Sequence, residues 1–75
     1  MQVQDAIITT EYITLDAFLK WTGVVLSGGD AKALISSGSV SVNSEVELRR
    51  GRKLRPGDRI TVMNHGQWAI RREEA

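Results

Sequence analysis

The amino-acid sequence predicts an α+β fold in which two helices pack on a small, mostly antiparallel sheet. Apolar residues recur at helical spacing in the first half of the chain and at every second position after Gly38. The predicted order is one strand, two helices and a run of strands, which is typical of α+β domains. The chain has 75 residues, enough for one hydrophobic core, so residues 1–75 are treated as a single domain.

A strand and a helix are expected first. Residues 6–10 are rich in β-branched types and predict a short strand. The following helix is predicted by Leu15, Phe18, Leu19 and Thr22, which stand at the helical spacing i, i+3, i+4, i+7. Thr14 is the expected N-cap and Gly23 marks the helix end. Trp21 is expected in the core, because large aromatic side chains are mostly buried in small domains.

The second helix has a clearer start signal. Ser27 with Asp30 three residues later matches a capping box, in which Ser27 is the N-cap. The apolar face of this helix consists of Ala31, Leu34 and Ile35. Gly38 is a suitable C-terminal stop, so the helix has about three turns at most.

The remaining segments alternate with a period of two and predict strands. The side chains expected to face the core are Val40, Val42, Val46 and Leu48. By the same alternation Glu45, Glu47 and Arg49 are expected to face away from it. Asn43-Ser44 lies between the two runs and suits a tight hairpin turn, because Asn tolerates a left-handed backbone.

Two further turns and two further strands complete the prediction. Pro56-Gly57 suits a type II turn, with Pro fixing one dihedral angle and Gly accepting a positive φ. A strand is expected around Ile60 and Val62. Asn64-His65-Gly66 is expected to form another turn, and residues 67–70 a last strand.

Positive charge is concentrated in one segment of a nearly neutral chain. The formal net charge is +1, from 10 Lys and Arg against 9 Asp and Glu. Six of the ten positive residues are Arg49, Arg50, Arg52, Lys53, Arg55 and Arg59. Only Asp58 opposes them within this segment. Arginine forks pair bidentately with phosphate oxygens, so the cluster indicates a phosphate-binding surface. A solvated loop without a partner is the simpler interpretation.

The start of the second helix is another candidate. Ser27, Gly28 and Gly29 place backbone N–H groups at a helix N-terminus, where proteins often hold phosphate. The alternative is a capped helix and nothing more. Lys32 lies off the apolar face near this start and could reach the same phosphate path.

Three motifs occur in the order found in a known family of RNA-binding domains. They are Leu15-Asp16; the series Ser27, Ala31, Leu34, Ile35, Gly38, Val40, Val42, Asn43; and Gly57-Asp58-Arg59-Ile60-Thr61-Val62. With them, residues 15–62 resemble the domain named after ribosomal protein S-four, the alpha-L motif. Thr14 and Gly28 stand where the family usually has basic residues, and Ser44 replaces a turn glycine. Two features, residues 27–32 (Ser-Gly-Gly-Asp-Ala-Lys) and the run of arginines, resemble more the short stand-alone branch of the family that includes the bacterial YaaA and YbcJ proteins.

The resemblance implies a small alpha-L fold and binding to structured RNA, either ribosomal or transfer RNA, with association with the ribosome. The residues expected to contact RNA are Ser27, Gly28, Gly29, Lys32, Asn43, Arg49, Arg50, Arg52, Lys53 and Arg55. The alternative function is a protein-interaction module whose basic loop docks an acidic protein.

Other classes of function have little support in the sequence. There is no cysteine, and His65 is the only histidine, so no zinc site and no catalytic triad is expected. No phosphate-loop or dinucleotide fingerprint occurs. The sequence therefore predicts a non-enzyme without a cofactor or metal. Residues 1–5 lack the basic region and long apolar run that are typical of a signal peptide, and the longest aliphatic run, residues 24–26, is too short to span a membrane. A cytoplasmic location is therefore expected.

Overall fold

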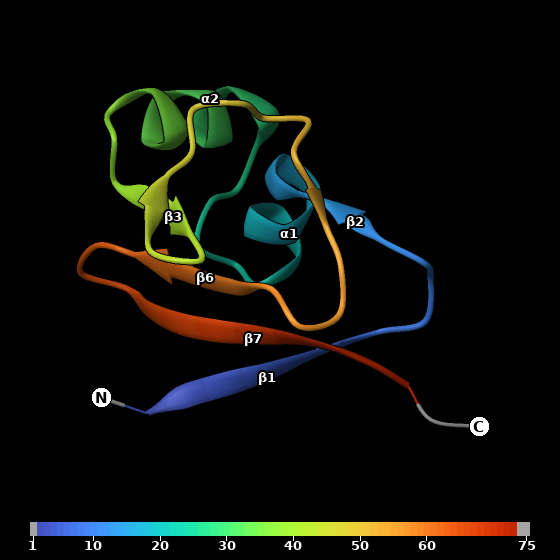
Figure 1. Cartoon of the computed structure of the whole chain (residues 1–75). Coiled ribbons are helices and arrows are strands. Elements are labelled where there is room, and N and C mark those ends of the chain that lie inside the picture. Colours follow the sequence, from blue (N-terminus) through green and yellow to red (C-terminus); the bar gives the residue numbers. More distant parts are fainter. Residues whose placement is uncertain (1, 74–75) are drawn as a thin grey trace.

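Two helices lie on the same side of a five-stranded sheet in the computed structural model, which describes residues 2–73 (Figure 1). The helices are α1 Leu15–Trp21 and α2 Gly28–Ser36. The strands are β1 Val3–Ile8, β2 Ile13–Thr14, β3 Val40–Val42, β4 Glu45–Val46, β5 Lys53–Leu54, β6 Arg59–Val62 and β7 Gly66–Arg72. The predicted α+β fold is confirmed. Within residues 2–73, no helix combines the length and apolar character needed to cross a membrane.

The sheet is mostly antiparallel, as predicted, and its strand order is β1-β7-β6-β3-β4. The exception is β1, which pairs in parallel with β7 from Val3 opposite Gln67 to Ile8 opposite Arg72. This pairing explains why β1 begins and ends earlier than the expected residues 6–10. The short strands β2 and β5 form a separate antiparallel pair.

Local signals account for the ends of both helices. Gly23 has φ +81° and donates its N–H to the carbonyl of Lys20, which ends α1 after one C-cap residue. Gly38 has the same φ and donates to the carbonyl of Ile35 at the end of α2. Ser27 is the N-cap of α2, and its Oγ accepts the N–H of Asp30 at 3.1 Å. The predicted N-cap at Ser27 is therefore confirmed, whereas Thr14, at the N-cap position of α1, makes no side-chain cap hydrogen bond.

Replacing Ser27 by alanine is expected to lower the free energy of unfolding by about 0.5–2 kcal/mol, because the Asp30 N–H loses its acceptor. Urea unfolding followed by circular dichroism measures this difference. The matched control is Ser36→Ala, the same chemical change at an exposed position of the same helix. Equal stabilities of the two variants would contradict the assigned cap.

The core lies between the helices and the sheet and includes Phe18, which is fully buried. The expected burial of Trp21 is wrong, because its side chain is 54% exposed. Trp68 from β7 is buried instead, and its ring packs edge-on against Phe18 with centroids 5.8 Å apart. Trp21 lies in the last turn of α1, and the centroid of its ring is 6.4 Å from that of Phe18 in an edge-on arrangement.

The hairpin of β3 and β4 corrects a second expectation. Val46 and Leu48 are 58% and 61% exposed, whereas Glu47 is buried. Asn43 and Ser44 both have positive φ and form a two-residue turn, which places Ser41 opposite Val46. Residues directly opposite share a face of the sheet, so Val46 lies with Ser41 on the side opposite to the core. The chain then leaves the sheet, and the alternation ends after Val46.

Candidate nucleic-acid interface

The basic loop, defined here as residues 49–55, is attached to the N-terminus of α1. The carbonyl of Arg52 accepts the N–H of Leu15 at 2.9 Å, and that of Arg50 accepts the N–H of Asp16 at 3.1 Å. These two carbonyls satisfy helix donors that the Thr14 side chain does not cap. At the other end of the loop, β5 pairs with β2. The backbone of the basic loop is therefore held by hydrogen bonds to α1 and β2.

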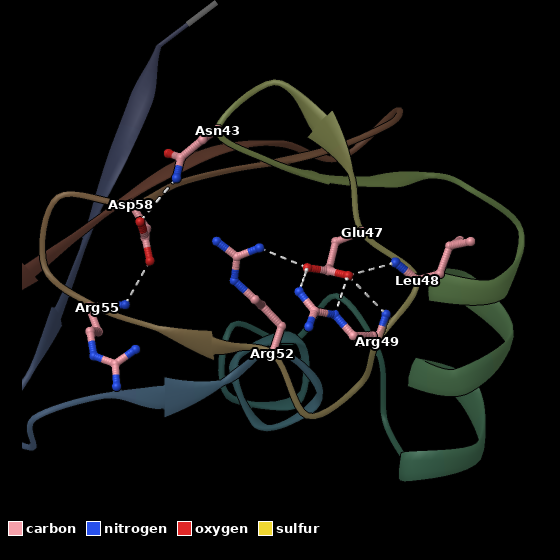
Figure 2. Close-up of polar contacts among 7 residues, drawn as sticks. All are labelled: Asn43, Glu47, Leu48, Arg49, Arg52, Arg55 and Asp58. Carbon is pink, nitrogen blue, oxygen red and sulfur yellow. Dashed lines mark hydrogen bonds and ion pairs between the residues drawn. The ribbon is translucent and has the colours of Figure 1, made fainter.

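The carboxylate of Glu47 organises the start of the basic loop (Figure 2). It accepts the N–H groups of Leu48 at 3.0 Å and of Arg49 at 3.2 Å. It also accepts hydrogen bonds from Nε and Nη2 of Arg49, both at 3.2 Å, and from Nη1 of Arg52 at 2.8 Å. The hydrogen bonds from Arg49 and Arg52 lower the pKa of Glu47 to about 2, so the carboxylate is ionised at neutral pH.

The basic residues of the loop consequently fall into two groups. Arg49 and Arg52 form ion pairs with Glu47, and their side chains are 74% and 32% exposed. Arg50, Lys53 and Arg55 are exposed and belong to no ion pair within residues 2–73. The sequence pattern treated all five as equivalent. The structure separates the two that order the loop from the three that present charge to solvent.

Tyr12 is a member of this surface that the sequence reasoning missed. Nζ of Lys53 lies 5.0 Å from the centroid of the Tyr12 ring, and Cζ of Arg55 lies 5.8 Å from it. Both distances fit cation–π contacts. Ile13 of β2 is opposite Leu54 of β5, which brings the preceding Tyr12 alongside Arg55. Pairing between two-residue strands leaves no readable pattern in a sequence, so no local signal could have shown this contact.

Asn43 and Asp58 connect the hairpin turn to the end of the basic loop. Nδ2 of Asn43 donates to Oδ1 of Asp58 at 3.0 Å, and Oδ1 of Asn43 accepts the N–H of Arg59 at 2.9 Å. Oδ2 of Asp58 accepts the N–H of Arg55 at 2.8 Å (Figure 2). The turn at Pro56-Gly57 is confirmed, with the Asp58 N–H donating to the Arg55 carbonyl and Gly57 at φ +100°. Asn43, expected to contact RNA, uses its amide within the protein.

The candidates on α2 lie apart from the hydrogen-bond network of the loop. Ser27 is engaged as N-cap, and Gly28, Gly29 and Lys32 belong to the first turns of α2. Lys32 is exposed. No hydrogen bond or ion pair between residues 2–73 joins these four residues to the basic loop. Both figures nevertheless show the segment after β4 running beside α2.

The side chains of the basic loop surround a shallow depression. It is lined by Arg49, Gly51, Arg52, Lys53 and Arg55. This lining offers guanidinium and ammonium donors, which suit phosphate oxygens. In the part of the chain that the structure describes, no group of His, Asp and Glu side chains is placed to hold a metal ion.

Comparison with known proteins gives two matches. The model of a family described as "S4 domain" matches residues 6–71. The chain is also similar to "Probable ribosome maturation protein RlbA" of Bacillus subtilis (strain 168), with 46% identity over 63 residues. That alignment covers 84% of this chain and 89% of the relative. The family match is longer than residues 15–62, which carry the motifs, and it reaches into β1 and β7.

Proposed function

The chain belongs to the S4 domain family, and from this premise we propose that it binds structured RNA through phosphate contacts of the basic loop. The similarity to a protein named for ribosome maturation supports ribosomal RNA as the partner and association with the ribosome as the setting. Transfer RNA is the second structured RNA that the proposal includes.

The observation that carries the proposal is a preorganised cationic loop. Arg50, Lys53 and Arg55 are exposed on a backbone held by α1, β2 and the Glu47 carboxylate. A loop that is ordered before binding loses less conformational entropy when it meets its ligand, so more of the electrostatic attraction contributes to affinity. RNA phosphates supply the negative charge that such a surface attracts.

The proposed role is binding without catalysis, and it needs no cofactor. The lining of the depression contains arginine, lysine and glycine and offers no group suited to act as nucleophile or general base near neutral pH. His65 lies in the turn before β7 and is exposed. The proposed setting is the ribosome, and the proposed location is therefore the cytoplasm.

A folded RNA hairpin is expected to bind more tightly than an unstructured RNA of equal length. Phosphate contacts depend on how the backbone is arranged in space, whereas single-strand binding depends on aromatic platforms for stacking. The aromatic ring of this surface, Tyr12, is already in contact with two cations. Competition binding at one salt concentration measures the preference. Equal affinities would contradict recognition of structured RNA, and absence of binding at low salt would favour docking of an acidic protein.

A further inference from the structure

A second cationic hollow lies at the end of the sheet, outside the basic loop. Its volume is about 540 Å³, and its lining is Pro56, Gly57, Arg59, Ala69, Ile70, Arg71, Arg72 and Glu73. Three of these residues are arginines, and two of the three come from the last residues of β7. Arg59 is the last member of the basic cluster in the sequence, whereas Arg71 and Arg72 lie outside that cluster.

Backbone pairing brings these arginines together from distant parts of the chain. Gly57 donates its N–H to the carbonyl of Ile70 at 2.9 Å, and Ile70 donates to the carbonyl of Asp58 at 2.9 Å. Arg59 of β6 is opposite Ala69 of β7. The Pro56-Gly57 turn is therefore fixed against β7, and the hollow is part of the folded framework.

The charges of the hollow are only partly neutralised within the protein. Nε of Arg71 donates to Oδ1 of Asp5 at 2.7 Å. Arg59 and Arg72 are exposed and take part in no ion pair within residues 2–73. Glu73 also lines the hollow and opposes an incoming anion. Arg59 and Arg72 are thus the arginines of the hollow that are available to pair with an anion, and the negative charge of Glu73 partly opposes this attraction.

The hollow is continuous with the basic loop along the chain. The depression of the basic loop includes Arg55, and the lining of the hollow begins at the next residue, Pro56. Pro56 and Gly57, at the border between the two sites, carry no charge and no long side chain. The nearby Asp58 carboxylate is engaged on the side of the basic loop, where it accepts the N–H of Arg55 and the amide of Asn43. A small anion would need only one of the sites. A nucleic acid, with a phosphate at every nucleotide, can occupy both sites.

From this arrangement we infer that the RNA surface extends past the basic loop, and that Arg59 and Arg72, which come from opposite faces at the end of the sheet, contact further phosphates of the same RNA molecule. The inference rests on the proposed function and adds a second contact site to it. It also accounts for the basic residues at the end of β7, which neither the core nor the basic loop uses.

The test is the double variant Arg59→Ala/Arg72→Ala with the hairpin RNA. Affinity at low salt is expected to fall about threefold to tenfold, and the slope of log K against log salt to flatten by roughly one to two units for one or two lost phosphate contacts. Lys20→Ala is the control, since it removes an exposed positive charge of α1 outside both hollows. Circular dichroism confirms that each variant is folded.

Glu73→Gln provides the opposite change. It is expected to tighten binding, because a negative charge is removed from the lining of the hollow. Parent-like affinity and salt slope for the double variant would overturn the inference. The inference would also be overturned if Lys20→Ala reduced RNA affinity as much for each positive charge removed. That result would indicate attraction by the overall charge of the protein. A parent protein that binds no RNA would overturn the proposed function itself, so the two failures are distinguishable.

Discussion

Replacing Arg50, Lys53 and Arg55 together by alanine is expected to weaken binding of the hairpin RNA at least tenfold at low salt. Each exposed cation that neutralises a phosphate releases a counterion, and the slope of log K against log salt changes by roughly 0.7–0.9 for each contact. Loss of three contacts should therefore flatten that slope by about two to three units. Titrations at several salt concentrations measure both quantities.

The triple variant leaves the ordering of the loop intact. All three side chains are exposed, and Arg49 and Arg52 keep their ion pairs with Glu47. The free energy of unfolding should change little, because exposed substitutions are usually worth within about ±0.5 kcal/mol each. Lys20→Ala is again the control for loss of charge elsewhere. A folded triple variant with the affinity and salt slope of the parent would place the RNA site away from the basic loop.

Replacing Glu47 by alanine is expected to lower the free energy of unfolding by about 2–4 kcal/mol. The change removes the acceptor of the Leu48 and Arg49 N–H groups and the ion-pair partner of the partly buried Arg52 side chain. Breaking a partly buried charge pair costs more than the pair contributes, since its partner stays desolvated. Urea unfolding measures the loss. Glu45→Ala is the matched control, because it removes an exposed carboxylate, two residues earlier, that belongs to no ion pair within residues 2–73.

The same carboxylate predicts an acid dependence of stability. Hydrogen bonds from Arg49 and Arg52 lower the pKa of Glu47 from its ordinary value of 4.5 to about 2. A group whose pKa is lowered by folding stabilises the native state fully above its unfolded pKa, and this contribution is lost as the pH falls towards the folded value. Between pH 5 and pH 2 the parent should lose more stability than Glu47→Gln, in which this position cannot titrate. Parallel profiles of the two proteins would contradict the assigned contacts.

Glu47 also shows how the basic loop differs from an ordinary charged loop. Its single carboxylate joins two backbone N–H groups and two arginines, so part of the positive charge is used to order the remainder. The charge left over is presented by Arg50, Lys53 and Arg55 on an ordered backbone. This division of roles gives the two variants above distinct expected phenotypes: one changes RNA affinity and the other changes stability.

Features that depend on near neighbours could be predicted from the sequence. The cap at Ser27, the helix ends at Gly23 and Gly38 and the turn at Pro56-Gly57 all occur where expected. Each is determined by side-chain hydrogen bonds or by backbone dihedral angles within a few residues. The clustering of positive charge is equally local, because it is a property of one short segment.

Features that depend on long-range pairing were decided only by the tertiary structure. The register of the Asn43-Ser44 hairpin places Val46 on the exposed face of the sheet. Hydrogen bonds with the loop backbone hold Glu47 in a buried position. Trp68, not Trp21, packs in the core beside Phe18, because β7 is an interior strand of the sheet while Trp21 lies in the last turn of a helix.

The two basic surfaces differ in the same way: one depends on local sequence and the other on long-range pairing. The basic loop is contiguous in the sequence and was visible there. The second hollow joins Arg59 to Arg71 and Arg72 through the antiparallel pairing of β6 and β7 and the docking of the Pro56-Gly57 turn on Ile70. Composition and periodicity describe which face a residue occupies within its own element. They do not specify which elements become neighbours, because that choice depends on how all the apolar faces are buried together.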